Sequence, residues 1–237
     1  ACKDVNDIMM PVACNGKIEI GRSGECGDLI CRGDVFLRDY ATINGDVRTS
    51  GNITCQNNVT VTGNSLSKIN IPSSELPLAF PAMDNPVYSA DEMANLEPGT
   101  ECELPPGNYG NYYAKRDTKL KLCSGVYYFN KIDMGVASAS LILDEEDGPV
   151  EIYIKSHFRM RGTIEHSRSG IDGARNFMVV CYGDRTVDLN CGFSGTIVAP
   201  NANLIMAQTE KYYEGSFYAK SIEIHQDAII KYIPYAY

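Results

Sequence analysis

The stretch GDVFLRDYATINGDVRTSGNITCQNNVTVTGNSLSK, residues 33–68, contains two consecutive copies of one 18-residue unit. Gly33 aligns with Gly51 and Gly45 with Gly63, and short runs of alternating apolar residues lie between these glycines. A period this short, in which Gly and Asn interrupt β-branched residues, is typical of a β-solenoid. Each copy is therefore predicted to form one coil of a parallel β-helix.

The alternation within each copy predicts which side chains fill the core, because successive residues of a strand point to opposite faces. The inward positions of the first copy are Val35, Leu37, Ala41, Ile43 and Val47, and those of the second are Ile53, Cys55, Val59 and Val61. Cys55 occupies the position that Leu37 holds one coil earlier. We therefore expect Cys55 to be a buried free thiol that packs as a small hydrophobic residue.

The whole chain of 237 residues is predicted to form one all-β domain, a right-handed single-stranded parallel β-helix. It is expected to have about ten coils, with one proline-rich excursion that contains a short helix. Residues 1–32 are expected to be an N-terminal cap and residues 33–71 regular coils. A proline-rich strap is expected at 72–106, and longer coils with a C-terminal cap at 107–237.

Seven of the eleven prolines fall within residues 72–106, and proline cannot donate to a sheet ladder. This segment is therefore expected to leave the stack. Within it, SADEMANL predicts a short helix with Ser89 as its N-cap. We favour a strap along the flank of the solenoid, and the alternative is a binding loop.

A second repeat, with a period of 20 residues, relates the segments that begin at Gly195 and Gly215. It predicts that Ala202 stacks on Ile222. The inward pairs Ile197 with Phe217, Ala199 with Ala219 and Leu204 with Ile224 follow from the same alignment. Val198 and Tyr218 are then expected to point outward, and Tyr232, Tyr235 and Tyr237 to close the end of the stack.

The net charge of −9 argues against binding to nucleic acid and to anionic membrane surfaces, both of which favour Lys and Arg. No apolar run approaches the roughly 18 residues of a spanning helix, so no direct membrane insertion is expected.

Nine cysteines are many for a cytosolic protein and favour an oxidising compartment. The closely spaced candidates for disulfide bonds are Cys2 with Cys14, Cys26 with Cys31, and Cys102 with Cys123. Cys181 and Cys191 fall on apolar alternation and are expected in the core, bonded or not.

No cofactor is expected. The acidic run Asp144, Glu145, Glu146 and Asp147 offers oxygen ligands for calcium, but a solvated turn is favoured because no 12-residue ligand loop surrounds it. The three histidines, His157, His166 and His225, are spaced too widely to predict a metal site and are expected to be surface or corner residues. We find no paired carboxylates or nucleophile motif that would favour an enzyme over a non-enzymatic module.

Tyrosine is abundant, with fifteen residues and no tryptophan. In an adjacent pair of strand tyrosines, one member must face outward. Exposed aromatic rings suit stacking on sugars or packing at a protein interface. The candidate binding residues are Tyr112, Tyr113, Tyr212, Tyr213 and Tyr218.

Five segments resemble a β-helical domain of bacterial surface and pilus-associated proteins. They are LPPGNYG (104–110), the run that includes SGVYYF (120–129), GPVEIYI (148–154), GTIVAPNANL (195–204) and GSFYAKSIEI (215–224). Residues 33–68 are also similar to the short repeats of bactofilin-type solenoids. The resemblance implies an extracellular or cell-surface location and a non-enzymatic role, and it transfers no catalytic residue.

The sequence therefore predicts a structural or adhesive module of a bacterial surface protein, whose partners are other surface proteins, carbohydrate or further copies of itself. One alternative is a self-assembling subunit of an extracellular filament or pilus. A second alternative is a β-helix that binds or cleaves polysaccharide.

Overall fold

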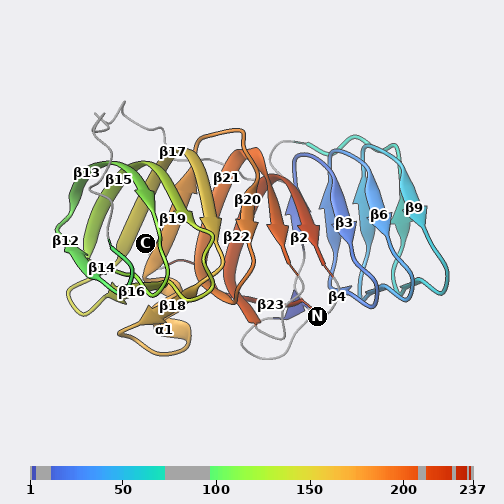
Figure 1. Ribbon diagram of the computed structural model, residues 1–237. Coiled ribbons are helices and arrows are strands. Elements are labelled where there is room, and N and C mark those ends of the chain that lie inside the picture. The colour runs from blue at the N-terminus through green and yellow to red at the C-terminus, as the bar shows by residue number, and fades with distance from the viewer. Residues whose placement is uncertain are drawn as a thin grey trace.

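The computed structural model describes residues 2–3, 12–72, 97–207, 212–225, 228–233 and 235, with only the backbone of residues 2, 3 and 229. Its strands pair in parallel and stack as a β-solenoid of about ten turns (Figure 1). The described part contains one short helix, α1 (Ile171–Arg175). None of the described helices is long and apolar enough to cross a membrane.

One sheet runs the length of the stack. In spatial order its main path is β13 (Gly107–Tyr113), β15 (Gly125–Met134), β17 (Val150–Met160), β19 (Phe177–Cys181), β21 (Phe193–Met206), β22 (Tyr212–Ile224), β3 (Ile18–Ile20), β6 (Val35–Leu37) and β9 (Ile53–Cys55). Attached to it are β20 (Val187–Leu189), β23 (Ile229–Tyr232) and β1 (Cys2–Lys3).

Three smaller parallel sheets close the other sides. They are β12 (Glu101–Leu104), β14 (Lys119–Cys123), β16 (Ser140–Asp144) and β18 (Thr163–His166); β2 (Val12–Cys14), β5 (Leu29–Cys31), β8 (Val47–Thr49) and β11 (Ser65–Leu66); and β4 (Glu25–Cys26), β7 (Thr42–Ile43) and β10 (Thr60–Val61).

The 18-residue register is confirmed. Val35 pairs with Ile53 and Leu37 with Cys55 across β6 and β9. One coil earlier the step is 17 residues, because Ile18 pairs with Val35. The inward residues of the coil at 33–50 are completely buried, as the alternation predicts.

The coils do not stack in the order of the sequence. The last long strand, β22, pairs with β3 from the beginning of the chain, so β3 lies between β22 and β6 (Figure 1). From β3 the stack proceeds to β9 at one end, while β12 and β13 form the other end. The chain therefore passes from one end of the stack to the other between Leu66 and Glu101.

This order corrects two predictions about the ends. Residues 1–32 were expected to cap the stack, but the described residues 12–32 form one complete coil and the first strand of the next, in the interior of the stack. β23 likewise pairs with β22 and β1 rather than closing an end. The predicted strap at 72–106 is too long, since residues 101–104 already form β12. The predicted helix at Ser89 lies outside the described residues.

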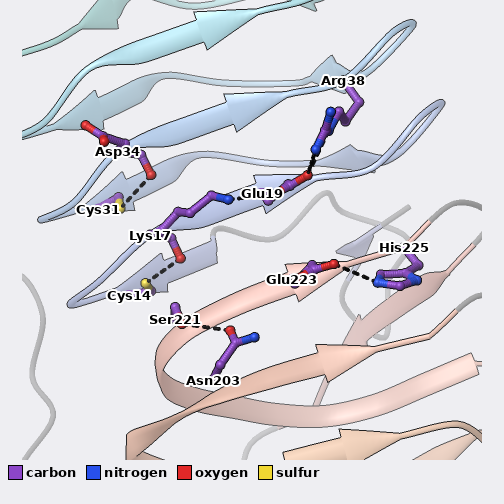
Figure 2. A network of polar contacts seen from close by, with 10 residues as sticks. All are labelled: Cys14, Lys17, Glu19, Cys31, Asp34, Arg38, Asn203, Ser221, Glu223 and His225. Atoms are coloured by element: carbon purple, nitrogen blue, oxygen red, sulfur yellow. Dashed lines mark hydrogen bonds and ion pairs between the residues drawn. The ribbon is translucent and has the colours of Figure 1, made fainter. Parts of the chain in front are cut away.

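We call the contact of β22 with β3 the seam. Figure 2 shows its outward side, where Glu223 of β22 and Glu19 of β3 are neighbours in the backbone register of the two strands. Lys17 Nζ lies 2.6 Å from Glu19, Arg38 also pairs with Glu19, and His225 lies 2.8 Å from Glu223. Burial alone would raise the pKa of Glu19, but the hydrogen bonds from Lys17 and Arg38 outweigh it and hold that pKa below its usual range.

The repeat of 20 residues holds only for the first half of each long strand. Gly195 pairs with Gly215 and Ala199 with Ala219, as predicted. An irregularity then follows, and Leu204 rather than Ala202 pairs with Ile222. The predicted pairs beyond Ala199 are therefore wrong by two residues, because β21 carries two extra residues where the coil turns a corner.

A column of thiols and one hydroxyl lines a corner beside the seam. Cys14, Cys31 and Thr49 are in register across β2, β5 and β8. The Cys31 thiol donates to the carbonyl oxygen of Gly16 at 2.6 Å, and the Thr49 hydroxyl donates to that of Gly33. The thiols therefore bond to corner backbone groups in the same way as the threonine hydroxyl.

The predicted disulfide bonds are wrong wherever both side chains are described. No disulfide bond joins any two of the described cysteines, which are Cys14, Cys26, Cys31, Cys55, Cys102, Cys123, Cys181 and Cys191. Cys26 and Cys31 belong to different sheets. Cys102 packs against the core, whereas Cys123 bonds to the outward Glu103. The side chain of Cys2 lies outside the described residues.

Candidate functional site

The coil of residues 51–66 forms one end of the stack, and we call it the open end (Figure 1). Its strands β9, β10 and β11 each pair with the preceding coil on one edge, and no described strand pairs with the other edge. Its inward side chains Ile53, Val59 and Val61 are only partly buried, and Leu66, in register with the outward Arg48, is 45% exposed. Within the part of the chain that the structure describes, the open end therefore presents strand edges without a partner strand together with apolar core side chains.

Two predictions were made for Cys55: that it stacks on Leu37, and that its thiol is free and buried. It stacks directly on Leu37, so the predicted register is confirmed. The thiol is free, as predicted, but it is exposed rather than buried. The prediction of burial is wrong because no coil of the described chain covers this layer.

Aspartate side chains of residues 33–50 accept hydrogen bonds from the backbone of the open end. The Oδ1 atoms of Asp34 and Asp46 accept hydrogen bonds from the backbone N–H groups of Asn52 and Asn64, at 2.8 and 2.7 Å. Asp46 therefore links three coils: its Oδ1 atom accepts from the next coil, and its backbone N–H donates to Oδ1 of Asp28 in the preceding coil. At the open end, the amide oxygens of Asn52 and Asn64 hold the positions that would serve one more coil.

The strands of the open end carry no charged side chain, and the first charge after them is that of Lys68, whose N–H donates to the carbonyl oxygen of Gly51. Residues 51–66 contain no Asp, Glu, Lys, Arg or His, whereas residues 33–50 contain Asp34, Arg38, Asp39, Asp46 and Arg48. Exposed sheet edges usually carry charges or prolines that prevent pairing with another chain. Strands β9, β10 and β11 lack both, so their outer edges are suited to accept further strands.

The opposite end is protected. The ring of Tyr109 stacks on Phe129 at a centroid distance of 5.2 Å, and its hydroxyl donates to the carbonyl oxygen of Pro105. Pro105 and Pro106 separate β12 from β13, and β12 carries Glu101 and Glu103. Aromatic cover, prolines and charges all disfavour strand addition here.

The tyrosine pairs alternate as predicted, but not all the candidates are accessible. Tyr113 and Tyr212 are 44% and 57% exposed, whereas Tyr112 and Tyr213 are buried, at 1% and 0%. The Tyr213 hydroxyl donates to the carbonyl oxygens of Leu189 and Ala207. Tyr112 and Tyr213 are therefore core residues, and their predicted binding role is wrong.

The remaining three tyrosines do not form one site. Tyr113 lies at the protected end with Lys131 over its ring, and Tyr212 lies five strands away in β22. Tyr218 points outward as predicted, but it packs against an outward apolar cluster that includes Val180 and Val198. A binding role for Tyr113, Tyr212 and Tyr218 remains a prediction.

The acidic run is not a uniformly solvated turn. Glu146 and Asp147 are exposed, but Glu145 is completely buried and lies 2.9 Å from His166 Nδ1. His166, predicted to be a surface or corner residue, is mostly buried against Phe177. No group of three metal-binding side chains occurs among the described residues.

The sequence contains one indication of the open end that the repeat pattern does not reveal. The loss of all five charges between one copy of the 18-residue unit and the next marks the second copy as different. Regular repetition led us to treat both copies as interior coils. Chemically, the open end offers hydrogen-bonding edges and apolar side chains, which suit association rather than catalysis.

A family model described as a domain of unknown function, DUF7305, matches residues 81–234. The match covers the strands from β12 to β23, and the regular 18-residue coils lie outside it. The comparisons with curated proteins and with solved structures gave no match.

Proposed function

The chain belongs to the DUF7305 family, a domain of unknown function, and on that premise we propose that it is a non-enzymatic structural module that self-associates through its open end. Two copies would meet open end to open end and bury the uncharged coils of residues 51–66. The observation that carries this proposal is that this coil is exposed, apolar on its inward side and free of charge.

The two ends differ, and this favours a closed pair over an endless filament. A head-to-tail filament would need the protected end, with Tyr109, Pro105 and Pro106, to accept the open end of the next copy. A contact between two like surfaces forms a twofold dimer and consumes both open ends. The free backbone groups of the two coils would pair across the dimer, and their apolar side chains would leave water together.

The location outside the cell or on its surface is part of the same proposal. Its support is the likeness of residues 104–110, 195–204 and 215–224 to β-helical domains of bacterial surface proteins. In that setting a pair of stacks would act as a rigid link between two copies of the larger surface protein.

Sedimentation tests the proposal with one matched pair of variants. Val61→Lys places a charge among the inward apolar side chains of the open end, and Val126→Lys places one at an apolar residue on the flank that is 37% exposed. We expect the 26.0 kDa chain to form dimers and the Val61→Lys variant to dimerise about tenfold more weakly or worse.

The flank variant should dimerise like the unchanged chain. A chain that stays monomeric at high concentration would contradict self-association. Long polymers, or equal dimerisation of both variants, would contradict an interface made of two open ends.

A further inference from the structure

A polar depression lies in the middle of the long sheet, on its outward face. It crosses β17, β20, β21 and β22, where Arg159 pairs with Asp188, Asp188 with Ile205, and Ile205 with Glu223. We call it the central depression, and the side chains that matter here are His157, Arg159, Asp188, Asn190, Ile205 and His225. It is separate from the open end, which lies beyond β3 and β6.

The side chains of the central depression are positioned by one another. Asp188 accepts a hydrogen bond from the Asn190 amide and lies 3.6 Å from Arg159 Nε. His225 is fixed by Glu223 at 2.8 Å. Arg159 and His225 both have side chains that are 41% exposed, so their outer atoms remain accessible to a ligand.

An apolar floor lies between these polar groups, formed by Ile205 and Ala207. Sites for small ligands commonly combine an apolar surface with a few fixed polar groups. A sugar ring fits such a surface, because its C–H face can pack on the floor while its hydroxyl groups bond to carboxylate, amide, guanidinium and imidazole groups.

Basic and acidic side chains alternate at the central depression, with Arg159 beside Asp188, Lys131 beside Asp133 and His225 beside Glu223. Burial lowers the pKa of His157, and Lys131, Arg185 and Arg159 lower it further, against the opposing effect of Asp133. A carboxylate is the ligand group best matched to a guanidinium, since the two can form paired charge-assisted hydrogen bonds.

We propose that the central depression binds a uronate residue of an acidic polysaccharide, with the carboxylate of the sugar on Arg159 and its ring over Ile205. The chain of sugars would lie across the strands, which are spaced about 4.8 Å apart. Asp188 and Asn190 would bond to its hydroxyl groups. This adds carbohydrate recognition to a module whose self-association uses a different surface.

Calorimetry with short oligosaccharides of known chemistry tests this. The probes are oligogalacturonate and oligomannuronate, with a neutral maltooligosaccharide of equal length. The variant is Arg159→Gln, and the matched control is Arg116→Gln, which makes the same charge change at an exposed residue of the protected end. We expect at least one uronate probe to bind, with affinity about tenfold lower in Arg159→Gln and unchanged in Arg116→Gln.

Three results would overturn the proposal. They are the absence of binding by both uronate probes, equal binding of the neutral probe, and equal loss of affinity in the two variants. Thermal unfolding of Arg159→Gln, compared with that of the unchanged chain, ensures that a loss of affinity is not a loss of fold. Because Arg159 is partly exposed, the variant is expected to fold.

Discussion

Replacement of Glu145 by leucine is expected to lower the free energy of unfolding by about 3 kcal/mol or more, because it leaves the buried His166 without its partner. Glu145 is completely buried and its Oε1 lies 2.9 Å from His166 Nδ1. Neither Glu145 Oε2 nor His166 Nε2 has a further hydrogen-bond partner among the described residues. For a chain of this size the loss corresponds to a melting temperature lower by about 6 to 12 °C.

Two further variants show whether the pair acts as a unit. Glu146 is the exposed neighbour of Glu145, so Glu146→Leu should change the stability by only about 0.5 kcal/mol. The double variant Glu145→Leu with His166→Phe removes both polar groups and should recover part of the lost stability. Urea unfolding measures all three. A double variant no more stable than Glu145→Leu alone would contradict the account of a mutually dependent pair.

Gly16→Ala is expected to destabilise the seam by about 2 to 3 kcal/mol, because a Cβ atom at this position would lie 1.9 Å from the carbonyl oxygen of Lys220. The backbone of β3 would have to move away from β22, and the Ile18 to Ile222 pairing would weaken. A lower midpoint of urea unfolding and faster hydrogen exchange of the β3 amides should accompany the change.

Gly107→Ala is the matched control for this variant. A Cβ atom at Gly107 would meet its nearest neighbour, the Tyr109 hydroxyl, at 3.7 Å, which is an ordinary contact. Its unfolding midpoint should stay close to that of the unchanged chain. Equal midpoints for Gly16→Ala and Gly107→Ala would show that β3 does not lie against Lys220.

The fold class was predictable because the 18-residue unit repeats both its turn residues and its alternation. Leu37 and Cys55 fall in register for that reason alone. The spatial order of the coils was not predictable from this pattern. Any apolar coil with parallel strands can stack on any other, and the 34 residues between Leu66 and Glu101 are enough to join neighbouring coils or opposite ends of the stack.

The candidate site, too, was predictable only in part. The alternation predicts that one tyrosine of each pair faces outward, but it does not say which, and Tyr112 and Tyr213 proved to be buried. Cys55 was expected to be buried because a coil was assumed to follow it. Its exposure, like the meeting of His157 and His225 in the central depression, depends on which coils are neighbours.

Crosslinking of native lysines in the monomer tests the order of the coils most directly. The seam places Lys17 beside Lys220, whose carbonyl oxygen lies 3.5 Å from Cys14 Sγ. Lys68 and Lys119 lie near opposite ends of a path of nine strands, which is roughly 38 Å long at about 4.8 Å per strand. With a short amine-reactive crosslinker and mass spectrometry, we expect a Lys17–Lys220 link and no Lys68–Lys119 link. A stack in sequence order would give the reverse, a Lys68–Lys119 link without Lys17–Lys220, and that result would contradict the account.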